Sequence, residues 1–84
     1  MNSRDLSFLK RSGIRVGLAE SCTGGLASYL IARIPGASAV LEASWVTYSE
    51  ASKRRLLRVS ARTLARFGPV SEQVASEMAS GVLK

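Results

Sequence analysis

The sequence predicts an α/β fold built around a parallel sheet. Two segments have the apolar character of β-strands, residues 14–19 and residues 39–48, and an amphipathic segment with helical spacing lies between them. Further segments with helical spacing precede the first strand and follow the second. A strand, a helix and a second strand in this order form a βαβ unit, whose strands run parallel and whose helix covers one face of the sheet.

The first two helices are expected to begin at hydroxyl side chains, which cap helices well. Ser3 precedes a predicted helix over residues 4–12, and Gly13 ends it. Thr23 precedes a predicted helix over residues 24–33. The apolar residues of this second helix recur at helical spacing, so they are expected to form the face that packs on the sheet. They are Leu26, Tyr29, Leu30 and Ile34.

The remaining helices are predicted in the same way. A turn over residues 35–38 leads into the second strand. Three serines then stand where helices are expected to begin. Ser49 precedes a short helix that runs to Leu57, Ser60 precedes one that runs to Phe67, and Ser71 precedes one that runs to about Leu83.

Two parallel strands make a thin sheet. Parallel sheets are normally covered by helices on both faces and contain more strands than two. A chain of 84 residues also buries only about 60% of its unfolded surface, which limits its stability. We therefore expect residues 1–84 to form a single, incomplete domain, which further residues or another copy would complete.

Composition excludes several classes of site. The chain has no His, so it has no Ser-His-Asp triad, no Cys-His dyad and no His-based zinc site. Its one cysteine, Cys22, cannot form an internal disulfide, which suits a reducing compartment. No apolar run approaches the roughly 20 residues of a membrane span. The sequence therefore predicts a cytoplasmic protein without a metal or another cofactor.

The net charge of +6 is unevenly distributed, because six of the twelve Lys and Arg residues lie between positions 53 and 66. Three interpretations stay open: a solvated basic face, a site for an anion such as a phosphate, or a nucleic-acid surface. Nucleic acid is the least expected, because the chain has no RNP, KH or zinc-finger pattern. Ser60 is expected to interrupt any helix that would align these cations in one stripe.

A polar turn follows the first strand, at the carboxyl edge where open α/β sheets bind ligands. It contains Glu20, Ser21, Cys22 and Thr23, followed by Gly24 and Gly25. The two glycines let a ligand approach the backbone closely, and its N–H groups can hold a phosphate or an oxyanion. The alternative is a capped helix with a polar turn that binds nothing.

A second polar cluster follows the second strand. Tyr48 and Lys53 are expected near the same edge of the sheet as Ser21. A lysine that gives up its proton can act as a general base, and a tyrosine can donate or relay a proton. Ser, Lys and Tyr together can hydrolyse a bond without histidine. The alternatives are a strand end for Tyr48 and a surface position for Lys53.

Four blocks in order resemble the CinA C-terminal domain family: AESCTGG at 19–25, PGAS at 35–38, VTYSEASK at 46–53 and FGPVSEQVASEMASG at 67–81. Members of the family include nicotinamide-nucleotide amidohydrolases, also called nicotinamide mononucleotide deamidases. The resemblance covers nearly the whole chain and implies a three-layer α/β/α fold. These residues would supply a truncated half of it, with about two parallel strands and four to five helices.

The resemblance implies that Ser21 is the nucleophile and that Tyr48 and Lys53 assist it. The turn residues Glu20, Thr23, Gly24 and Gly25 would bind the substrate. The implied reaction converts nicotinamide mononucleotide and water into nicotinate mononucleotide and ammonia, a step of pyridine-nucleotide salvage that needs no metal. The resemblance also implies that the protein forms a homo-oligomer. Two interpretations remain beside it: a non-catalytic remnant that binds nucleotides or oligomerises, and a basic nucleic-acid-binding module.

Overall fold

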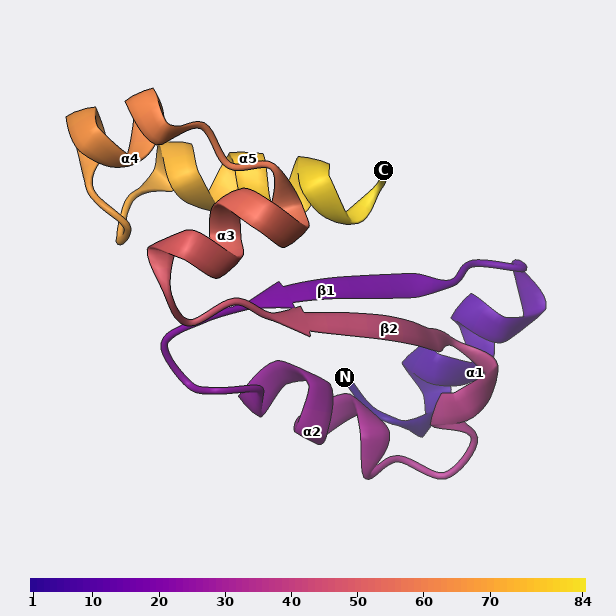
Figure 1. Ribbon diagram of the computed structural model, residues 1–84. Helices are drawn as coiled ribbons and strands as arrows, with labels where there is room; N and C mark the ends of the chain where they lie inside the picture. Colours follow the sequence, from indigo (N-terminus) through magenta and orange to yellow (C-terminus); the bar gives the residue numbers. More distant parts are fainter.

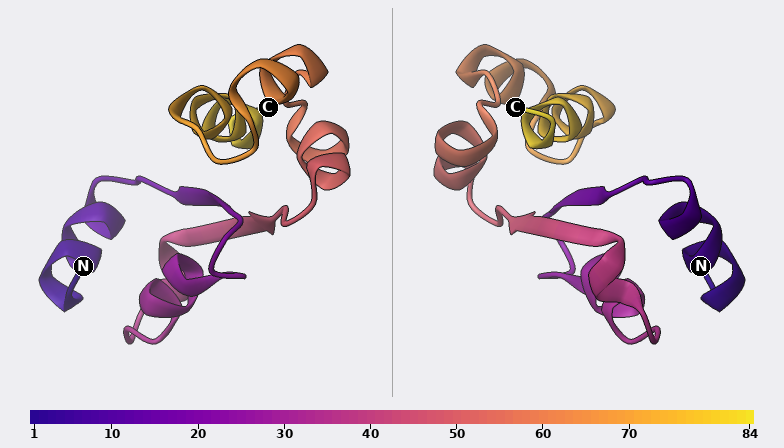
Figure 2. Two further views of the ribbon diagram at one scale, coloured as in Figure 1. Left: turned by 90° about the vertical axis from the view of Figure 1, so that its left-hand side faces the viewer. Right: turned by 90° about the vertical axis from the view of Figure 1, so that its right-hand side faces the viewer.

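Helices cover both faces of a two-stranded parallel sheet in a computed structural model that describes residues 1–84. The elements are α1 (Ser3–Arg11), β1 (Val16–Glu20), α2 (Leu26–Ala32), a 3₁₀ turn (Ala37–Ala39), β2 (Leu41–Val46), α3 (Glu50–Leu57), α4 (Ala61–Phe67) and α5 (Glu72–Val82). Figure 1 shows their order along the chain. Figure 2 shows α1 and α2 on one side of the sheet and α3, α4 and α5 on the other. The predicted α/β fold, with about two parallel strands and four to five helices, is confirmed: the structure has two strands and five α-helices.

The strands pair in parallel, from Val16 opposite Leu41 to Glu20 opposite Val46. Both are shorter than predicted at their amino ends. The second strand starts at Leu41 because Ala37–Ala39 forms a 3₁₀ turn, in which a backbone N–H bonds to a carbonyl three residues earlier. The first strand extends one residue beyond its predicted end, so the Glu20 side chain belongs to the sheet.

Three of the predicted helix caps are confirmed. The hydroxyls of Ser49, Ser60 and Ser71 accept hydrogen bonds from the first backbone N–H groups of α3, α4 and α5. The prediction for α1 was wrong by one residue, because Asn2 caps it. The Asn2 side chain accepts from the Asp5 N–H at 2.9 Å, and the Asp5 carboxylate accepts from the Asn2 N–H at 3.2 Å.

Helix α2 begins later than predicted and buries a different face. Gly24 and Gly25 have φ angles of 70° and 123°, outside the helical region, so the helix starts at Leu26. The Thr23 hydroxyl still accepts from the Leu26 N–H at 3.1 Å.

The predicted apolar face of α2 is mostly exposed. Leu26, Tyr29 and Leu30 face solvent, whereas Ile31 and Ile34 turn toward the core. The spacing of these residues in the sequence predicts their positions around the helix. Apolar residues occur on more than one side of α2, however, so the spacing does not identify one buried face. Periodicity alone therefore did not decide which side of α2 faces the sheet.

Two apolar clusters hold the layers together, one on each side of the sheet. The first joins the three carboxyl-terminal helices to the strands through Ala19 and Trp45, and its buried members are Leu57, Val59, Leu64, Val74 and Met78. The second joins the two amino-terminal helices to β1 and the 3₁₀ turn, and its buried members are Leu6, Ile34 and Val40. The sheet is therefore covered on both faces although it has only two strands.

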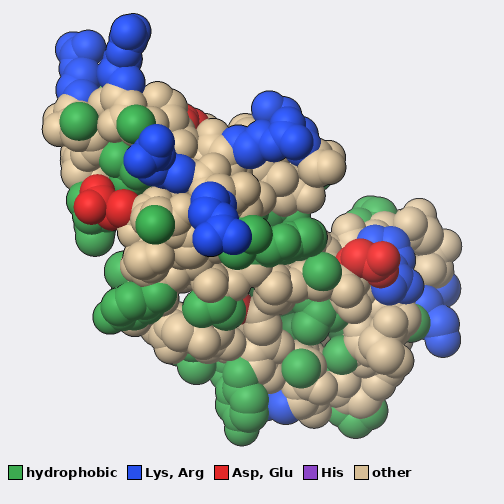
Figure 3. Space-filling view, in the orientation of Figure 1, with side chains coloured by type: hydrophobic (Ala, Val, Ile, Leu, Met, Phe, Trp, Pro, Cys, Tyr) green, Lys and Arg blue, Asp and Glu red, His purple; other side chains and the backbone are tan.

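The predicted interruption of the basic segment is also present. Helix α3 ends at Leu57, Arg58 follows with a φ of 58°, and α4 begins only at Ala61. The arginines consequently project from two separate helices, and Figure 3 shows Lys and Arg side chains dispersed over this face. No helix of the chain is both long and apolar enough to cross a membrane.

Candidate functional site

Ser21 and Lys53 meet at the carboxyl edge of the sheet. Ser21 follows β1 directly, and Lys53 lies on the first turn of α3, which follows β2. The Lys53 Nζ atom lies 2.8 Å from the Ser21 Oγ atom. Only 2% of the Lys53 residue is exposed, which is rare for a lysine. The fold thus brings together two residues that are 32 positions apart in the sequence.

The other partners of the Lys53 amino group are backbone carbonyls. Nζ lies 2.6 Å from the Thr47 oxygen and 3.4 Å from the Tyr48 oxygen. No carboxylate contacts it; the one ion pair of the chain joins Arg15 and Glu42. A buried lysine without a carboxylate partner is unusual, which makes Lys53 a candidate for a functional role.

The turn after Ser21 carries free backbone donors. The Gly24 N–H donates to the Ser21 carbonyl at 2.9 Å, which closes the turn. The N–H groups of Thr23 and Gly25 have no acceptor within the chain. A Cβ atom on Gly25 would meet only ordinary contacts, at 3.6 Å from Val46, so positive φ is the stronger reason for glycine there.

Glu20 is bonded to α2 and does not reach the Ser21–Lys53 pair. Its carboxylate accepts from the Ala27 N–H at 2.7 Å, from the Ser28 N–H at 3.1 Å and from the Ser28 hydroxyl. The Ser28 hydroxyl also lies 2.5 Å from the Ser44 hydroxyl of β2. The hydroxyl bond from Ser28 is the main reason that the pKa of Glu20 lies below its ordinary value, and burial acts against it. Glu20 therefore links β1, α2 and β2.

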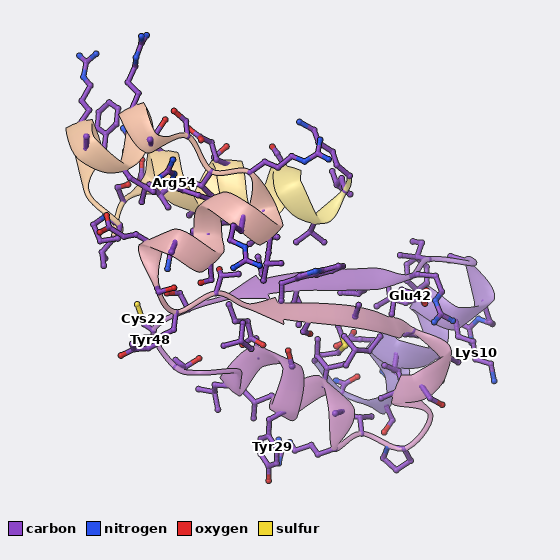
Figure 4. All side chains as sticks on the ribbon, viewed as in Figure 1. Lys10, Cys22, Tyr29, Glu42, Tyr48 and Arg54 are labelled. Atoms are coloured by element: carbon purple, nitrogen blue, oxygen red, sulfur yellow. The ribbon has the colours of Figure 1, made fainter.

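The side chains of Tyr48 and Cys22 project from the same end of the sheet into solvent, as Figure 4 shows. Tyr48 is 71% exposed, and its hydroxyl has no hydrogen-bond partner in the chain. Only its carbonyl contacts Lys53. Arg54 and Arg55 follow Lys53 in α3 but are exposed, so they are not cations packed around its amino group.

Sequence reasoning missed Thr47 and Ser28. Thr47 is completely buried, and it joins both strands to the site: its N–H donates to the Glu20 carbonyl at 2.8 Å and its carbonyl accepts from Lys53. Its hydroxyl has no partner. The only feature of the sequence that pointed to Thr47 was its position next to Tyr48. Nothing in the sequence indicated that Ser28 would pair with Glu20.

The fold and the site define a class: an α/β protein with a serine and a buried lysine at the carboxyl edge of a parallel sheet. Such a pair is suited to nucleophilic chemistry. The chain belongs to the CinA C-terminal domain family, whose model matches residues 1–84. The predicted family is therefore confirmed.

Relatives with known names and structures agree. A nicotinamide-nucleotide amidohydrolase from Enterobacter agglomerans is 55% identical over 75 residues, which are 89% of this chain and 46% of that protein. A CinA-like protein from Petrotoga mobilis is 50% identical over 76 residues, 90% of this chain and 19% of that protein. The crystal structure of the competence/damage inducible protein CihA from Agrobacterium tumefaciens matches with a TM-score of 0.91 and 44% identity, over 95% of this chain and 48% of that one.

The match covers only part of each relative. The chain spans about half the length of the amidohydrolase relative and of the CihA structure, and about a fifth of the CinA-like relative. The CinA superfamily protein from Escherichia coli gives the same proportion, with 96% of this chain and 47% of that one at a TM-score of 0.91.

Proposed function

We propose that Ser21 and Lys53 are the nucleophile and the general base of a nicotinamide-nucleotide amidohydrolase. The observation that carries this proposal is the 2.8 Å contact between Lys53 Nζ and Ser21 Oγ, made by a lysine that is buried and has no carboxylate partner. The substrate class comes from the amidohydrolase relative. The reaction would convert nicotinamide mononucleotide and water into nicotinate mononucleotide and ammonia.

Three oxygen atoms surround Nζ, and each accepts a hydrogen bond from it in the structure. A neutral amine has two N–H donors and one lone pair. The carbonyls of Thr47 and Tyr48 can only accept, so they orient the two N–H groups. In the proposed base form, the lone pair would replace the N–H group that donates to Ser21 Oγ, and the Ser21 O–H would donate to it. This arrangement holds Lys53 ready to take the Ser21 proton.

The proposed steps follow from that geometry. Ser21 Oγ attacks the carboxamide carbon while its proton passes to Lys53 Nζ, and the carbonyl oxygen becomes an oxyanion. The free N–H groups of Thr23 and Gly25 are the candidate donors to this oxyanion, since the Gly24 N–H is already bonded. Lys53 returns the proton to the leaving nitrogen, and ammonia departs. Water, deprotonated by Lys53, then hydrolyses the acyl ester and frees Ser21.

Tyr48 and Glu20 have different parts in this proposal. The exposed Tyr48 hydroxyl is free to contact the substrate, and its carbonyl orients Lys53. Glu20 holds the turn against α2 and acts through position alone, because its oxygen atoms are occupied by Ala27 and Ser28. That the chain forms a homo-oligomer remains a prediction.

The test is ammonia release from nicotinamide mononucleotide by the 84-residue chain and by its Ser21→Ala variant. Ser76→Ala is the matched control, because Ser76 is an exposed serine of α5. We expect the chain and the control to release ammonia and Ser21→Ala to release none. Equal rates for Ser21→Ala and the parent chain would rule out Ser21 as the nucleophile.

A second candidate is a non-catalytic module that binds nucleotides. The observation that favours it is the pair of free N–H groups of Thr23 and Gly25, which can hold a phosphate without any catalysis. It predicts that nicotinamide mononucleotide binds to the chain without ammonia release. Calorimetric binding combined with the ammonia assay separates the two candidates.

A further inference from the structure

The first half of α2 meets the sheet through a polar residue. Ser28 is the one residue of the segment 26–30 that is not exposed. Figure 4 shows the side chain of its neighbour Tyr29 pointing away from the sheet. Helix α2 has no fully buried residue, and its apolar contact with the core lies further along, at Ile31. The polar contacts of Ser28 therefore hold the beginning of α2 on the sheet.

Two hydroxyl groups in series join α2 to β2. The Ser28 hydroxyl donates to the Glu20 carboxylate and lies 2.5 Å from the Ser44 hydroxyl. A serine hydroxyl has one proton, and an ionised carboxylate can only accept. The Ser28 proton therefore serves Glu20, which leaves the Ser44 proton to make the contact with Ser28. Hydrogen bonds in such a series polarise and strengthen one another.

The Glu20 carboxylate closes the loop that carries the candidate nucleophile. It accepts from the Ala27 N–H at 2.7 Å and from the Ser28 N–H at 3.1 Å, so one side chain fixes both ends of the segment 21–26. Glu20 is only 7% exposed, and its carbonyl is bonded to the Thr47 N–H of β2 at 2.8 Å. The loop is thus anchored to the sheet at one end and to α2 at the other.

The candidate oxyanion donors lie inside this loop. A Cβ atom on Gly25 would stand 3.9 Å from the Glu20 Oε2 atom, so the Gly25 backbone rests against the anchored carboxylate. The Thr23 hydroxyl accepts from the Leu26 N–H at 3.1 Å, which ties Thr23 to the start of α2. A shift of α2 along the sheet would consequently move both free N–H groups relative to Ser21.

We propose that Ser28 and Ser44 are positioning residues for the hydrolysis of the carboxamide. Neither side chain is bonded to Ser21 or Lys53, and both act through Glu20, which fixes the loop. This role rests on the proposed function, because the loop N–H groups matter as donors only if an oxyanion forms. Donors stabilise a developing charge best when they are already in place and do not reorganise during the reaction.

The first test needs no turnover. Nitrogen-15 relaxation gives an order parameter for each backbone N–H group, about 0.85 in a rigid backbone and below about 0.6 in a flexible one. We expect rigid values for Thr23 and Gly25 in the parent chain. Ser28→Ala and Ser44→Ala should each lower both values toward the flexible range. Alanine is the best helix former, so α2 itself should survive Ser28→Ala.

Two control variants isolate the effect of the hydroxyl groups. Ser44→Thr keeps a hydroxyl on β2, where β-branched residues are favoured, and should retain the parent order parameters. Ser76→Ala removes the hydroxyl of an exposed serine of α5 and should also retain them. The order parameters of α5 report on the rest of the fold and should stay constant in every variant.

Ammonia release from nicotinamide mononucleotide gives the second test. Ser28→Ala should lower kcat by roughly tenfold to a hundredfold, because a misplacement of about 1 Å can cost that much. KM should stay nearly the same, since the lost alignment matters in the transition state. The double variant Ser28→Ala/Ser44→Ala should be no slower than Ser28→Ala, because Ser44 acts only through Ser28.

Three results would overturn this role. The first is a parent chain in which the Thr23 and Gly25 N–H groups are already flexible. The second is order parameters that stay at the parent values in both alanine variants. The third is a double variant whose loss in kcat is the product of the two single losses. A parent chain that releases no ammonia would contradict the proposed function instead, and the order parameters would still decide whether Ser28 and Ser44 hold the loop.

Discussion

The backbone of Gly81 in α5 lies against the backbone of Leu57 in α3. A Cβ atom built on Gly81 would stand 2.2 Å from the Leu57 carbonyl oxygen, and backbone atoms on both sides of this contact cannot move aside easily. Leu57 is almost fully buried at the centre of the larger apolar cluster. The approach of α5 to α3 therefore depends on the absence of a side chain at position 81.

Gly81→Ala should destabilise the chain. Overpacking of this kind costs about 1–3 kcal/mol. Helix propensity alone would favour alanine by about 1 kcal/mol, so the two effects have opposite signs. Urea unfolding followed by circular dichroism measures the difference. Ser80→Ala is the control and should leave the free energy of unfolding nearly unchanged, whereas a more stable Gly81→Ala would contradict the close contact.

Lys53→Met should abolish most of the proposed activity while the fold survives. Methionine fills a similar volume without the amino group, so the Ser21 hydroxyl loses its proton acceptor. General-base catalysis contributes about 10²–10⁴-fold, and ammonia release should fall by that order. Lys10→Met, at an exposed position of α1, is the control. Retention of the parent rate in Lys53→Met would remove Lys53 from the mechanism.

The hydrogen bonds to Glu20 make stability depend on pH. The Ser28 hydroxyl, and then the N–H groups of Ala27 and Ser28, hold the pKa of Glu20 below its ordinary value of 4.5. A carboxylate with a lowered pKa stabilises the fold fully above that ordinary value. This contribution is lost as the pH falls through the lowered pKa.

Glu20→Gln should consequently be less stable than the parent chain at pH 7, and the difference should shrink in acid. Urea midpoints at pH 7 and pH 3 measure it. Glu72→Gln is the control, because the Glu72 side chain is exposed and makes no hydrogen bond or ion pair. If the difference in urea midpoint between Glu20→Gln and the parent chain is the same at pH 7 and pH 3, ionised Glu20 does not stabilise the turn.

Thr47→Val should not destabilise the chain. The Thr47 hydroxyl is buried without a partner, and an unsatisfied buried group costs about 1–3 kcal/mol. Valine keeps the shape and removes that group, so the free energy of unfolding should stay the same or rise. The matched comparison is Thr63→Val, which loses the hydrogen bond from the Thr63 hydroxyl to Glu77 and should destabilise. A destabilised Thr47→Val would indicate a partner for the Thr47 hydroxyl.

Much of the fold could be predicted because it rests on local chemistry. Ser49, Ser60 and Ser71 cap the helices that follow them through bonds to residues two or three positions away. The order of elements also predicted the parallel pairing of the strands. That pairing is the reason Ser21 and Lys53 were expected near one edge of the sheet.

The tertiary structure decided the rest. The packing of α2 against the sheet buried Ile31 and left Leu26 and Tyr29 in solvent, although all three are apolar positions of one helix.

The sequence also could not predict which polar side chains at the site are buried, exposed or hydrogen-bonded. Glu20 is bonded to α2, Tyr48 is exposed, and Thr47 is buried beside Lys53. Such contacts join residues from separate elements at distances of a few ångströms. The sequence by itself determined which elements form and in what order, because capping and periodicity act within a few residues. Only the packed structure decided which polar groups meet, because that depends on how far each helix shifts and turns against the sheet.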